Sequence, residues 1–465
     1  MLFSGIPFLY YFLPITIILY FLLPNRFKNA FLLLASLLFY AWGEPRYVLL
    51  MMGAILAFYL CGLAIGRSQK QETRRFWLAV SITLGVGMLA VFKYADFLLS
   101  TIGAVRGTAV PLLGLSLPIG ISFYTFQCMS YTVDVYRGDA RPQRNLISFG
   151  AYVSLFPQLI AGPIVRYVDV EKELKERTHT LRGFSLGLRR FLIGLGKKVL
   201  LANNLGLLIQ IFRDSSEKSL LFYWMYAVAF TLHIYFDFSG YSDMAIGLGR
   251  IFGFRFSENF DYPYLSKSVT EFWRRWHISL GSWFRDYVYI PLGGNRVPRW
   301  RWVCNIFIVW ALTGLWHGAA WNFVLWGLMF AILLWIEKQV PALKKLPGAL
   351  RHLYVMVLIV LSFVLFNAES LHQAGSDLAS LLGFSRIPAV TAQTLYYLRS
   401  YGIVYLIGFL GVTPLPKRLW QRLSQRPSLR PVLTVLEPIL LAVLLLVCTG
   451  YLVDGSFNPF LYFRF

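Results

Sequence analysis

The stretch from Asp261 to Trp326 decides the architecture of this chain, and it contains two unusual motifs. One reads Glu271-Phe-Trp-Arg-Arg-Trp-His277-Ile-Ser-Leu280, and the other reads Thr313-Gly-Leu-Trp-His317-Gly-Ala-Ala-Trp-Asn-Phe323. Both lie between apolar runs that are long enough to enter a membrane. An ionisable side chain at bilayer depth costs a few kcal/mol unless it is paired or hydrated, so such residues mark functional sites. We therefore expect the functional site in this stretch.

The composition indicates a membrane protein. The chain has 465 residues, of which 57% are hydrophobic and 17% aromatic, and its mean hydropathy is +0.59. Because about 17–25 apolar residues can cross a bilayer as a helix, we predict an all-α polytopic fold with about eleven membrane segments, several of them too short to cross alone, plus re-entrant pieces. The expected segments are residues 8–23, 30–42, 47–66, 76–92, 111–135, 185–211, 221–248, 303–336 (a pair), 353–367, 396–412 and 431–453.

The net charge of +22 does not indicate a nucleic-acid partner, because the Lys and Arg residues fall in short loops between the apolar segments. Such loops mark the cytoplasmic side of a membrane protein. The basic loops follow the first, third and fifth expected segments, while the alternate loops are poor in base. This asymmetry predicts a multi-pass protein of the cell membrane with both termini outside the cytoplasm. His179, in the basic 166–182 segment, is expected to be a solvated surface residue.

Two segments combine apolar character with helix-breaking residues. Leu117-Pro-Ile-Gly-Ile-Ser-Phe123 leads into the polar residue Gln127, and Phe156-Pro-Gln-Leu-Ile-Ala-Gly-Pro163 has two prolines and a glycine. Broken backbone is tolerated at membrane depth only where protein or a cavity shields it. We predict that the second segment is re-entrant. Gln127 either hydrogen-bonds between packed helices or lines a cavity.

The sequence contains no evident metal site or bound cofactor. Its four cysteines lie in or beside apolar segments without the paired spacing of a zinc site, and we interpret them as packing residues. The N-terminus has no basic region or cleavage site typical of a removed signal. It is expected to lead into the first membrane helix.

Charged residues interrupt the apolar segment that contains His233, Asp237 and Asp243. His233 and Asp237 are four residues apart and share one helix face, so they can pair with each other. Alternatively, Asp237 or Asp243 holds one of the arginines between Arg274 and Arg285, because intramembrane charges usually find partners. The run that contains Lys197 and Lys198 is expected at a helix end, where snorkelling explains the charge.

The two histidines of the central stretch suit acyl transfer to a hydroxyl group. His317 lies among small residues and tryptophans, and the short 303–336 pair places it near a hairpin bend that faces a cavity. A neutral imidazole there can accept the hydroxyl proton as a general base. His277 can orient the substrate or stabilise the developing oxyanion. The alternative for His317 is a buried histidine bonded to a backbone carbonyl.

Further residues of these motifs are candidates for substrate binding. Arginines hold phosphate and carboxylate groups well, although lipid-headgroup anchoring is an alternative role for them. We expect Arg274, Arg275 and Arg285 to recruit an anionic donor at the cytoplasmic mouth of the site. The complete set of predicted substrate-binding residues is Arg274, Arg275, Trp276, Arg285, Trp316, Asn322 and Asp237.

With these motifs the chain resembles the membrane-bound O-acyltransferase superfamily, in its bacterial alginate-type branch. The resemblance covers nearly the whole chain and rests on several phrases together. They are the 117–123, 156–163 and 271–280 phrases above, Tyr235-Phe-Asp-Phe-Ser-Gly-Tyr-Ser-Asp-Met-Ala245, Trp283-Phe-Arg-Asp-Tyr-Val-Tyr-Ile-Pro-Leu-Gly-Gly-Asn-Arg296, Leu315-Trp-His-Gly318 and Asn458-Pro-Phe-Leu-Tyr-Phe-Arg-Phe465. Asn203 departs from the pattern, which has Asp there.

The resemblance implies one transmembrane domain over residues 1–465, with a catalytic core at 111–337 and helices around a central tunnel. It places the invariant family histidine on His317 and the second on His277. It also implies an acyl thioester donor, acetyl-CoA in this branch, and transfer across the membrane to a polysaccharide acceptor. An extracytoplasmic acetyltransferase or esterase-like partner would complete the transfer.

Two other functions remain open at this point. The D-alanyl transfer proteins of teichoic acids share similar histidine motifs, although the 235–245 and 291–296 phrases favour the acetylating branch. A transporter or channel would also use broken helices and buried charge. The absence of evident inverted repeats in the sequence argues against it.

Overall fold

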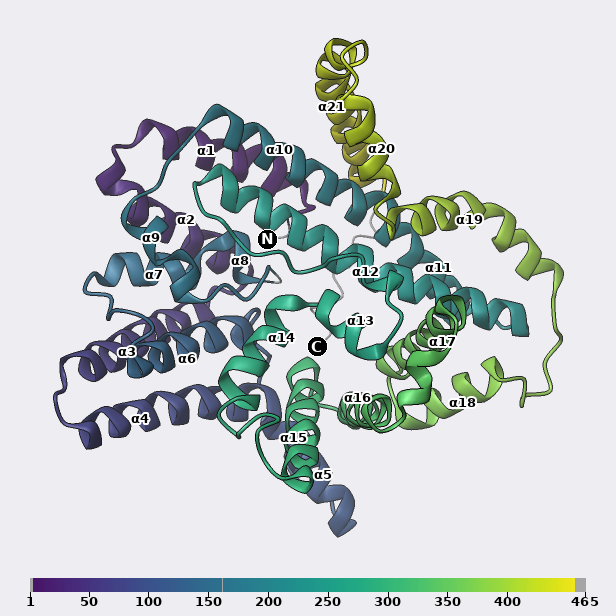
Figure 1. Ribbon diagram of the computed structural model, residues 1–465, viewed down its shortest axis with the longest axis horizontal. Helices are drawn as coiled ribbons and strands as arrows, with labels where there is room; N and C mark the ends of the chain where they lie inside the picture. The colour runs from purple at the N-terminus through teal and green to yellow at the C-terminus, as the bar shows by residue number, and fades with distance from the viewer. Residues whose placement is uncertain (1–2, 161, 456–465) are drawn as a thin grey trace. The chain divides into compact units, whose positions relative to one another are not determined.

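The computed structural model describes residues 3–160 and 162–455, and these residues form helices without any β-strand (Figure 1). The all-α prediction is therefore confirmed. The helices up to residue 214 are α1 (Leu13–Leu22), α2 (Lys28–Gly43), α3 (Tyr47–Arg67), α4 (Gln71–Leu89), α5 (Ala95–Arg106), α6 (Ile121–Arg137), α7 (Leu146–Ser154), α8 (Phe156–Leu159), α9 (Tyr167–Lys175), α10 (Leu181–Gly196) and α11 (Asn203–Asp214). The helices after it are α12 (Leu220–Ile251), α13 (Val269–Arg275), α14 (Ile278–Phe284), α15 (Arg299–His317), α16 (Trp321–Gln339), α17 (Gly348–Asn367), α18 (Leu371–Leu381), α19 (Ala392–Gly411), α20 (Leu415–Ser424) and α21 (Arg430–Asp454).

Short π- and 3₁₀-helical turns extend or join these helices. The π-turn Ala90–Tyr94 joins α4 to α5, and the π-turn Lys197–Ala202 joins α10 to α11. The remaining turns are Phe8–Phe12, Asn25–Phe27, Pro263–Leu265, Arg285–Tyr289 and Pro341–Lys345. The C-terminal phrase 458–465 and Ala161 lie outside the described residues.

Some of the expected membrane segments contain helices that are long and apolar enough to cross a membrane, and others do not. Within the described residues there are seven, or eight if α19 and α20, bent by 67°, form one broken span. All expected segments contain helix, but length and polarity separate them. At 1.5 Å per residue, α2, with 16 residues, falls short of the roughly 17–25 residues that cross a 30 Å core, and α6, with 17, is at the lower limit. Expected segment 111–135 becomes helical only from Ile121.

The described residues divide into two compact units, and α10 and α12 contribute residues to both. The first unit comprises residues up to Phe191 together with Ser242–Ser257. In it α3, α4 and α6 run side by side (Figure 1). Its core includes a cluster of aromatic rings that meet at centroid distances of 4.7–6.4 Å, namely Phe3, Phe8, Phe12, Phe39 and Phe156.

The predicted break near Phe156 is confirmed, because α7 ends at Ser154 and α8 begins at Phe156. The protein supplies partners for the interrupted backbone. Phe156 N–H donates to Ser36 Oγ at 3.1 Å, and Gln158 Nε2 donates to the Tyr152 carbonyl at 2.6 Å. All of these residues are buried. Shielding by protein thus explains how broken helix is tolerated here.

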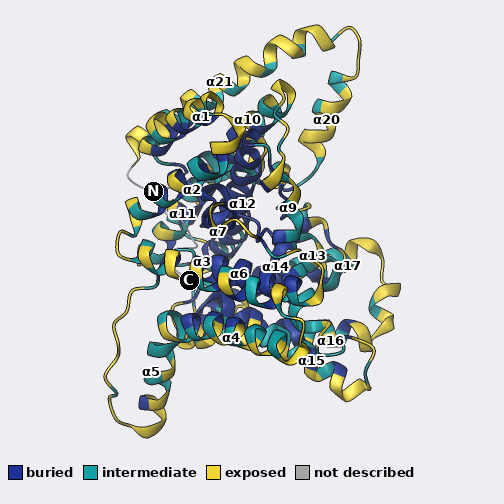
Figure 2. Ribbon diagram, turned by 90° about the vertical axis from the view of Figure 1, so that its left-hand side faces the viewer, coloured by how far each residue is buried: buried dark blue, intermediate teal, exposed yellow. Residues whose placement is uncertain are grey.

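The second unit comprises Leu192–Tyr241 and the described residues from Glu258. Its core packs α11, the first two thirds of α12, α13, α16 and α17 around Phe230, Trp276, Trp326 and Phe363. α15 and α16 form a close hairpin, in which a Cβ atom at Gly327 would overlap the Trp310 carbonyl. α12 is largely buried while α21 is nearly all exposed, as expected for a helix whose partner is lipid (Figure 2).

Candidate active site

His277 lies in a sharp turn between two short helices of the second unit. The Ser268 hydroxyl caps α13 by accepting a hydrogen bond from Glu271 N–H. α13 ends at Arg275, and α14 begins at Ile278. His277 itself has a left-handed φ of 46°, which costs a residue with a Cβ about 1–2 kcal/mol. Strained backbone of this kind is concentrated at functional sites.

Asn259 determines which nitrogen of His277 carries the proton. Its Oδ1 lies 3.2 Å from the Ser279 backbone N–H, which can only donate, so the amide atom there must be oxygen. The same oxygen lies 3.2 Å from His277 Nδ1. Because a carbonyl oxygen only accepts, Nδ1 must donate and must carry a hydrogen. In the neutral imidazole, Nε2 is therefore the unprotonated nitrogen and an obligate acceptor.

The surroundings of His277 keep it neutral. The residue is 1% exposed, and the ring of Phe238 packs edge-on at 4.6 Å. Burial, followed by the charge of neighbouring His317, lowers the pKa of His277 well below its ordinary value. Nε2 is buried and has no hydrogen-bond partner among the described residues. His277 thus has a spare proton-accepting nitrogen at neutral pH.

His317 is the last residue of α15, and α16 begins four residues later at Trp321. Its predicted position at a hairpin bend is therefore confirmed. The imidazole is 6% exposed, and its ring centroid lies 6.4 Å from that of His277. The rings of Trp326 and Phe366 stand edge-on at 5.2 and 5.4 Å. The two histidines, forty residues apart in sequence, form one pair within an aromatic enclosure.

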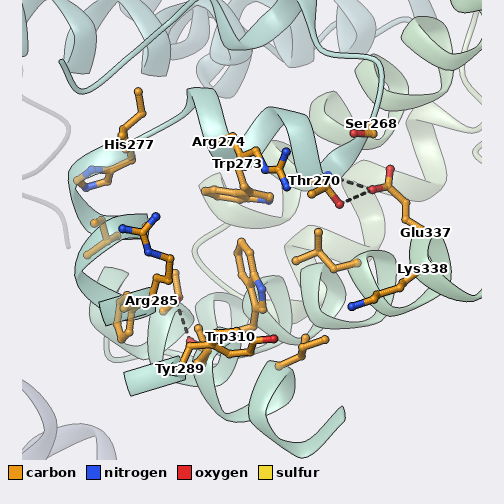
Figure 3. Close-up of a pocket in the computed structure, with 18 of the residues that line it drawn as sticks. Ser268, Thr270, Trp273, Arg274, His277, Arg285, Tyr289, Trp310, Glu337 and Lys338 are labelled. Atoms are coloured by element: carbon orange, nitrogen blue, oxygen red, sulfur yellow. Dashed lines mark hydrogen bonds between the residues drawn. The ribbon is translucent and has the colours of Figure 1, made fainter. Parts of the chain in front are cut away.

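A cavity of about 1050 Å³ lies beside His277 within the second unit, and Figure 3 shows part of its lining. His277 forms part of its wall, whereas His317 is not among the lining residues, contrary to the expectation that His317 itself faces a cavity. Aromatic and aliphatic side chains form the apolar part of the lining. Six basic side chains complete it, namely Lys267, Arg274, Arg285, Lys338, Lys344 and Arg351.

Glu337 is the one acidic residue in that lining, and its charge is fully engaged. Its carboxylate accepts hydrogen bonds from Val269 N–H at 2.6 Å, from Thr270 N–H at 3.0 Å and from the Tyr354 hydroxyl at 2.7 Å. Figure 3 shows the bond to Thr270. Glu337 therefore ties α16 to the first turn of α13, where a negative charge is favourable. The cavity as a whole attracts anions.

The predicted arginines separate into two groups. Arg274 and Arg285 line the cavity (Figure 3), and Arg285 also pairs with Asp286 at 2.7 Å. Arg275 is not part of the lining and forms ion pairs with Glu271 at 2.9 Å and Asp261 at 3.6 Å. The difference arises because adjacent helical residues point about 100° apart.

Three further candidates have positions that the structure explains by packing. Trp276 is buried and stacks on Phe272 at 5.5 Å. Asn322 donates to the Ala368 carbonyl at 2.9 Å and so fastens the start of α16. Trp316 is buried too, and it lies 5.7 Å from the His277 ring, in the wall around the histidine pair.

Asp237 has an ion-pair partner that the sequence analysis did not name. It forms a salt bridge of 2.5 Å with Lys198, and both side chains are at most 2% exposed. Lys198 is thus a buried ion-pair partner rather than a snorkelling residue. His233 bonds to the Ala202 carbonyl at 2.8 Å. In the first unit, Asp243 pairs with Arg190 at 2.9 Å. These pairings depend on how the helices pack, because Arg190 lies in α10 and Lys198 in the π-turn that extends it.

Sequence reasoning did not identify Asn259 or Glu337. Asn259 precedes the 261–326 stretch by two residues, and no local pattern connects it to His277. Glu337 gave a weak signal as a carboxylate at the end of an apolar segment. The described residues contain no group of three or more His, Cys, Asp or Glu side chains placed to hold a metal ion.

Comparison with known proteins agrees with this site. The profile of the membrane-bound O-acyltransferase family matches residues 121–369, which include both histidines. The probable alginate O-acetylase AlgI of Pseudomonas putida is 39% identical over 486 aligned positions, covering all of both chains. The peptidoglycan O-acetyltransferase of Helicobacter pylori is 34% identical over 83% of this chain and 81% of that protein. The teichoic acid D-alanyltransferase of Bacillus subtilis is 28% identical over 54% of this chain and 67% of that protein.

The polytopic helical fold and these relatives together indicate a membrane-bound acyltransferase. The chain belongs to the membrane-bound O-acyltransferase family.

Proposed function

We propose that this enzyme transfers an acetyl group from a cytoplasmic thioester to hydroxyl groups of an extracytoplasmic polysaccharide. The observation that supports it best is the basic cavity whose wall contains His277, a histidine with a spare acceptor nitrogen. The names of the alginate- and peptidoglycan-acetylating relatives support acetyl as the group and polysaccharide as the acceptor.

Acetyl-CoA is the proposed donor, and the cavity suits its chemistry. Its size falls at the upper end of pockets that enclose small molecules and cofactors, about 300–1000 Å³. Arg274 and Arg285 can hold phosphate groups of the donor through charge-assisted hydrogen bonds. The aromatic lining accommodates the less polar thioester arm, which would reach toward the histidine pair.

The chemical step joins the acceptor oxygen to the acyl carbon. The acceptor hydroxyl attacks the thioester carbonyl, a C–O bond forms, and the C–S bond breaks. His317 is the proposed general base that takes the hydroxyl proton, and the thiolate leaving group then takes up a proton. General-base assistance of this kind contributes about 10²–10⁴ in rate.

His277 has a different proposed role. Since Asn259 fixes the proton on Nδ1, neutral His277 has no Nε2–H to stabilise an oxyanion. It can instead accept a hydrogen bond from a second hydroxyl of the acceptor, and sugars offer several neighbouring hydroxyls. His277 thus orients the acceptor while His317 removes the proton.

The proposed location is the cell membrane, with the basic loops in the cytoplasm and both termini outside. The acyl group either reaches the polysaccharide directly or passes to an extracytoplasmic acetyltransferase or esterase-like partner protein. The donor would enter from the cytoplasmic side.

The test is acyl transfer in vesicles that contain the purified full chain, with labelled acetyl-CoA on the side of the basic loops. His317→Ala should lower kcat about 10²–10⁴-fold. His277→Ala should mainly raise the KM for the acceptor. His372→Ala is the matched control, because His372 is an exposed residue of α18.

Gel filtration in detergent establishes that each variant is folded. A folded His317→Ala enzyme with wild-type kcat would exclude His317 as the base. Absence of acetyl transfer by the wild-type protein, combined with transfer from a D-alanyl carrier protein, would favour the D-alanyl function. The lower identity to the teichoic acid enzyme makes this the second candidate.

A further inference from the structure

Two cationic side chains of the first unit surround the ring of Tyr20 without any acidic partner. Lys28 Nζ lies 4.9 Å from the ring centroid, and Arg177 Cζ lies 5.8 Å from it. Lys28 is 7% exposed. Neither residue forms an ion pair with any residue in the described ranges. A buried charge without a counter-charge is costly, so this arrangement calls for an anion.

His179 packs against the same tyrosine and belongs to this cluster. The Tyr20 hydroxyl donates its single proton to the Phe252 carbonyl at 2.9 Å. Its 2.9 Å contact with His179 Nε2 must therefore be a bond that His179 donates. The charges of Lys28 and Arg177 act after burial to lower the pKa of His179. His179, expected to be a solvated surface residue, is thus a half-buried member of the cluster.

The cluster contains a hydrogen-bond donor that has no partner among the described residues. Arg177 Nη2 donates to Asn29 Oδ1 at 2.6 Å, but Nη1 is buried without a hydrogen-bond partner. Lys28 is also the first residue of α2, a 16-residue helix whose N-cap makes no side-chain hydrogen bond. A helix N-terminus attracts negative charge. The Lys28 ammonium and Arg177 Nη1, both beside the Tyr20 ring, and the positive end of the α2 dipole are therefore the groups available to bind an oxyanion.

Apolar side chains at the edge of the cluster face outward. The exposed fractions are 41% for Phe21, 75% for Leu22, 47% for Phe27 and 90% for Leu181. Phe21 contacts the His179 ring at 5.5 Å. A ligand with a phosphate head and apolar chains would match both parts of this surface.

We propose that Lys28, Arg177 and the N-terminus of α2 bind the phosphate group of an anionic phospholipid, with its acyl chains against Phe21 and Leu22. The bound phosphate neutralises the buried Lys28 and the half-buried Arg177. The site is separate from the histidine pair, and the proposal does not depend on the acyl group that the enzyme transfers.

The test measures phosphatidylglycerol binding to the purified, delipidated full chain by native mass spectrometry. Arg177→Gln and Lys28→Gln should each weaken binding about tenfold or more, since a hydrogen bond to a charged group contributes about 1.5–3 kcal/mol. Arg182→Gln, a change of an exposed arginine five residues away, should leave it unchanged. Equal binding by all three variants would overturn the proposal.

Two further measurements distinguish the alternatives. Millimolar inorganic phosphate that raises the melting temperature as much as phosphatidylglycerol would assign the site to free phosphate and reject the lipid. In the lipid-free protein, Lys28→Gln should melt at the same or a higher temperature, because it relieves repulsion between cations. A lower melting temperature would show that Lys28 acts only through its contact with Tyr20, contrary to the proposal.

Discussion

Asn259 Oδ1 lies 3.2 Å from His277 Nδ1 and thereby selects the tautomer of a buried histidine. The amide is itself held by Ser279, whose hydroxyl donates to the same oxygen at 2.8 Å. The acceptor property of His277 Nε2 is thus determined by a residue eighteen positions earlier in the chain. Partners of this kind commonly tune the orientation and basicity of functional imidazoles.

Replacing Asn259 should change both rate and pH dependence. Asn259→Ala removes the hydrogen bond that selects the tautomer of His277. We expect kcat/KM to fall about 10- to 100-fold, the range typical of such orienting residues. Asn259→Asp places a carboxylate beside Nδ1–H, which favours the imidazolium and raises the pKa of His277. The acid limb of the kcat/KM profile should then move to higher pH. An unchanged profile in a folded Asn259→Asp enzyme would contradict the tautomer argument.

Two adjacent arginines provide an internal control for donor binding. Arg274 lines the cavity while Arg275 pairs with Glu271 outside its lining. Arg274→Gln should raise the KM for the donor about tenfold, since a charge-assisted hydrogen bond contributes about 1.5–3 kcal/mol. Arg275→Gln should change it less than twofold. Equal effects of the two changes in initial-rate assays would argue against the cavity as the donor site.

The lowered pKa of His277 predicts a pH dependence of stability. The unfolded state takes up a proton near pH 6.5, whereas the folded state does so only at lower pH. Between these values the unfolded state binds more protons, so stability falls as pH decreases, by up to about 1.4 kcal/mol per pH unit. Melting temperatures of wild type and His277→Gln should converge on acidification from pH 6.5. Parallel curves would contradict the lowered pKa.

The buried pair Lys198–Asp237 should respond strongly to the loss of one partner. Asp237→Asn leaves Lys198 as a buried, uncompensated charge, and we expect destabilisation by about 3–5 kcal/mol. The double change Lys198→Met with Asp237→Leu removes both charges and should restore much of the stability. Detergent melting curves measure both. A double variant as unstable as Asp237→Asn would show that the charge itself is not the cause.

Short sequence patterns were sufficient to predict the breaks and bends of helices, which depend on nearby residues. The break at Phe156 and the hairpin bend at His317 follow from Pro and Gly residues and from segment lengths, so both were predictable. Composition did not show which of the apolar segments are complete spans, because a short apolar helix such as α2 has the same composition as a spanning one. Only its observed ends show that it is too short.

The partners of buried charges were not predictable. Asp237 lies in a helix whose own sequence offers His233, yet its counter-ion is Lys198, because buried charges pair with whichever opposite charge the packing brings nearest. The motifs around His277 and His317 identified them as catalytic candidates. The sequence did not show that their rings lie 6.4 Å apart.

By itself, the sequence determined that this is an all-α membrane protein of an acyltransferase family, and it named His277 and His317 as the candidate catalytic residues. Hydrophobic periodicity, segment length and residue type are properties of the linear chain. Only the tertiary structure decided that His277 lines the cavity, that Arg275 turns away from it, and that Asn259 sets the imidazole tautomer. These outcomes depend on distances between residues far apart in the chain, which the packing of helices alone determines.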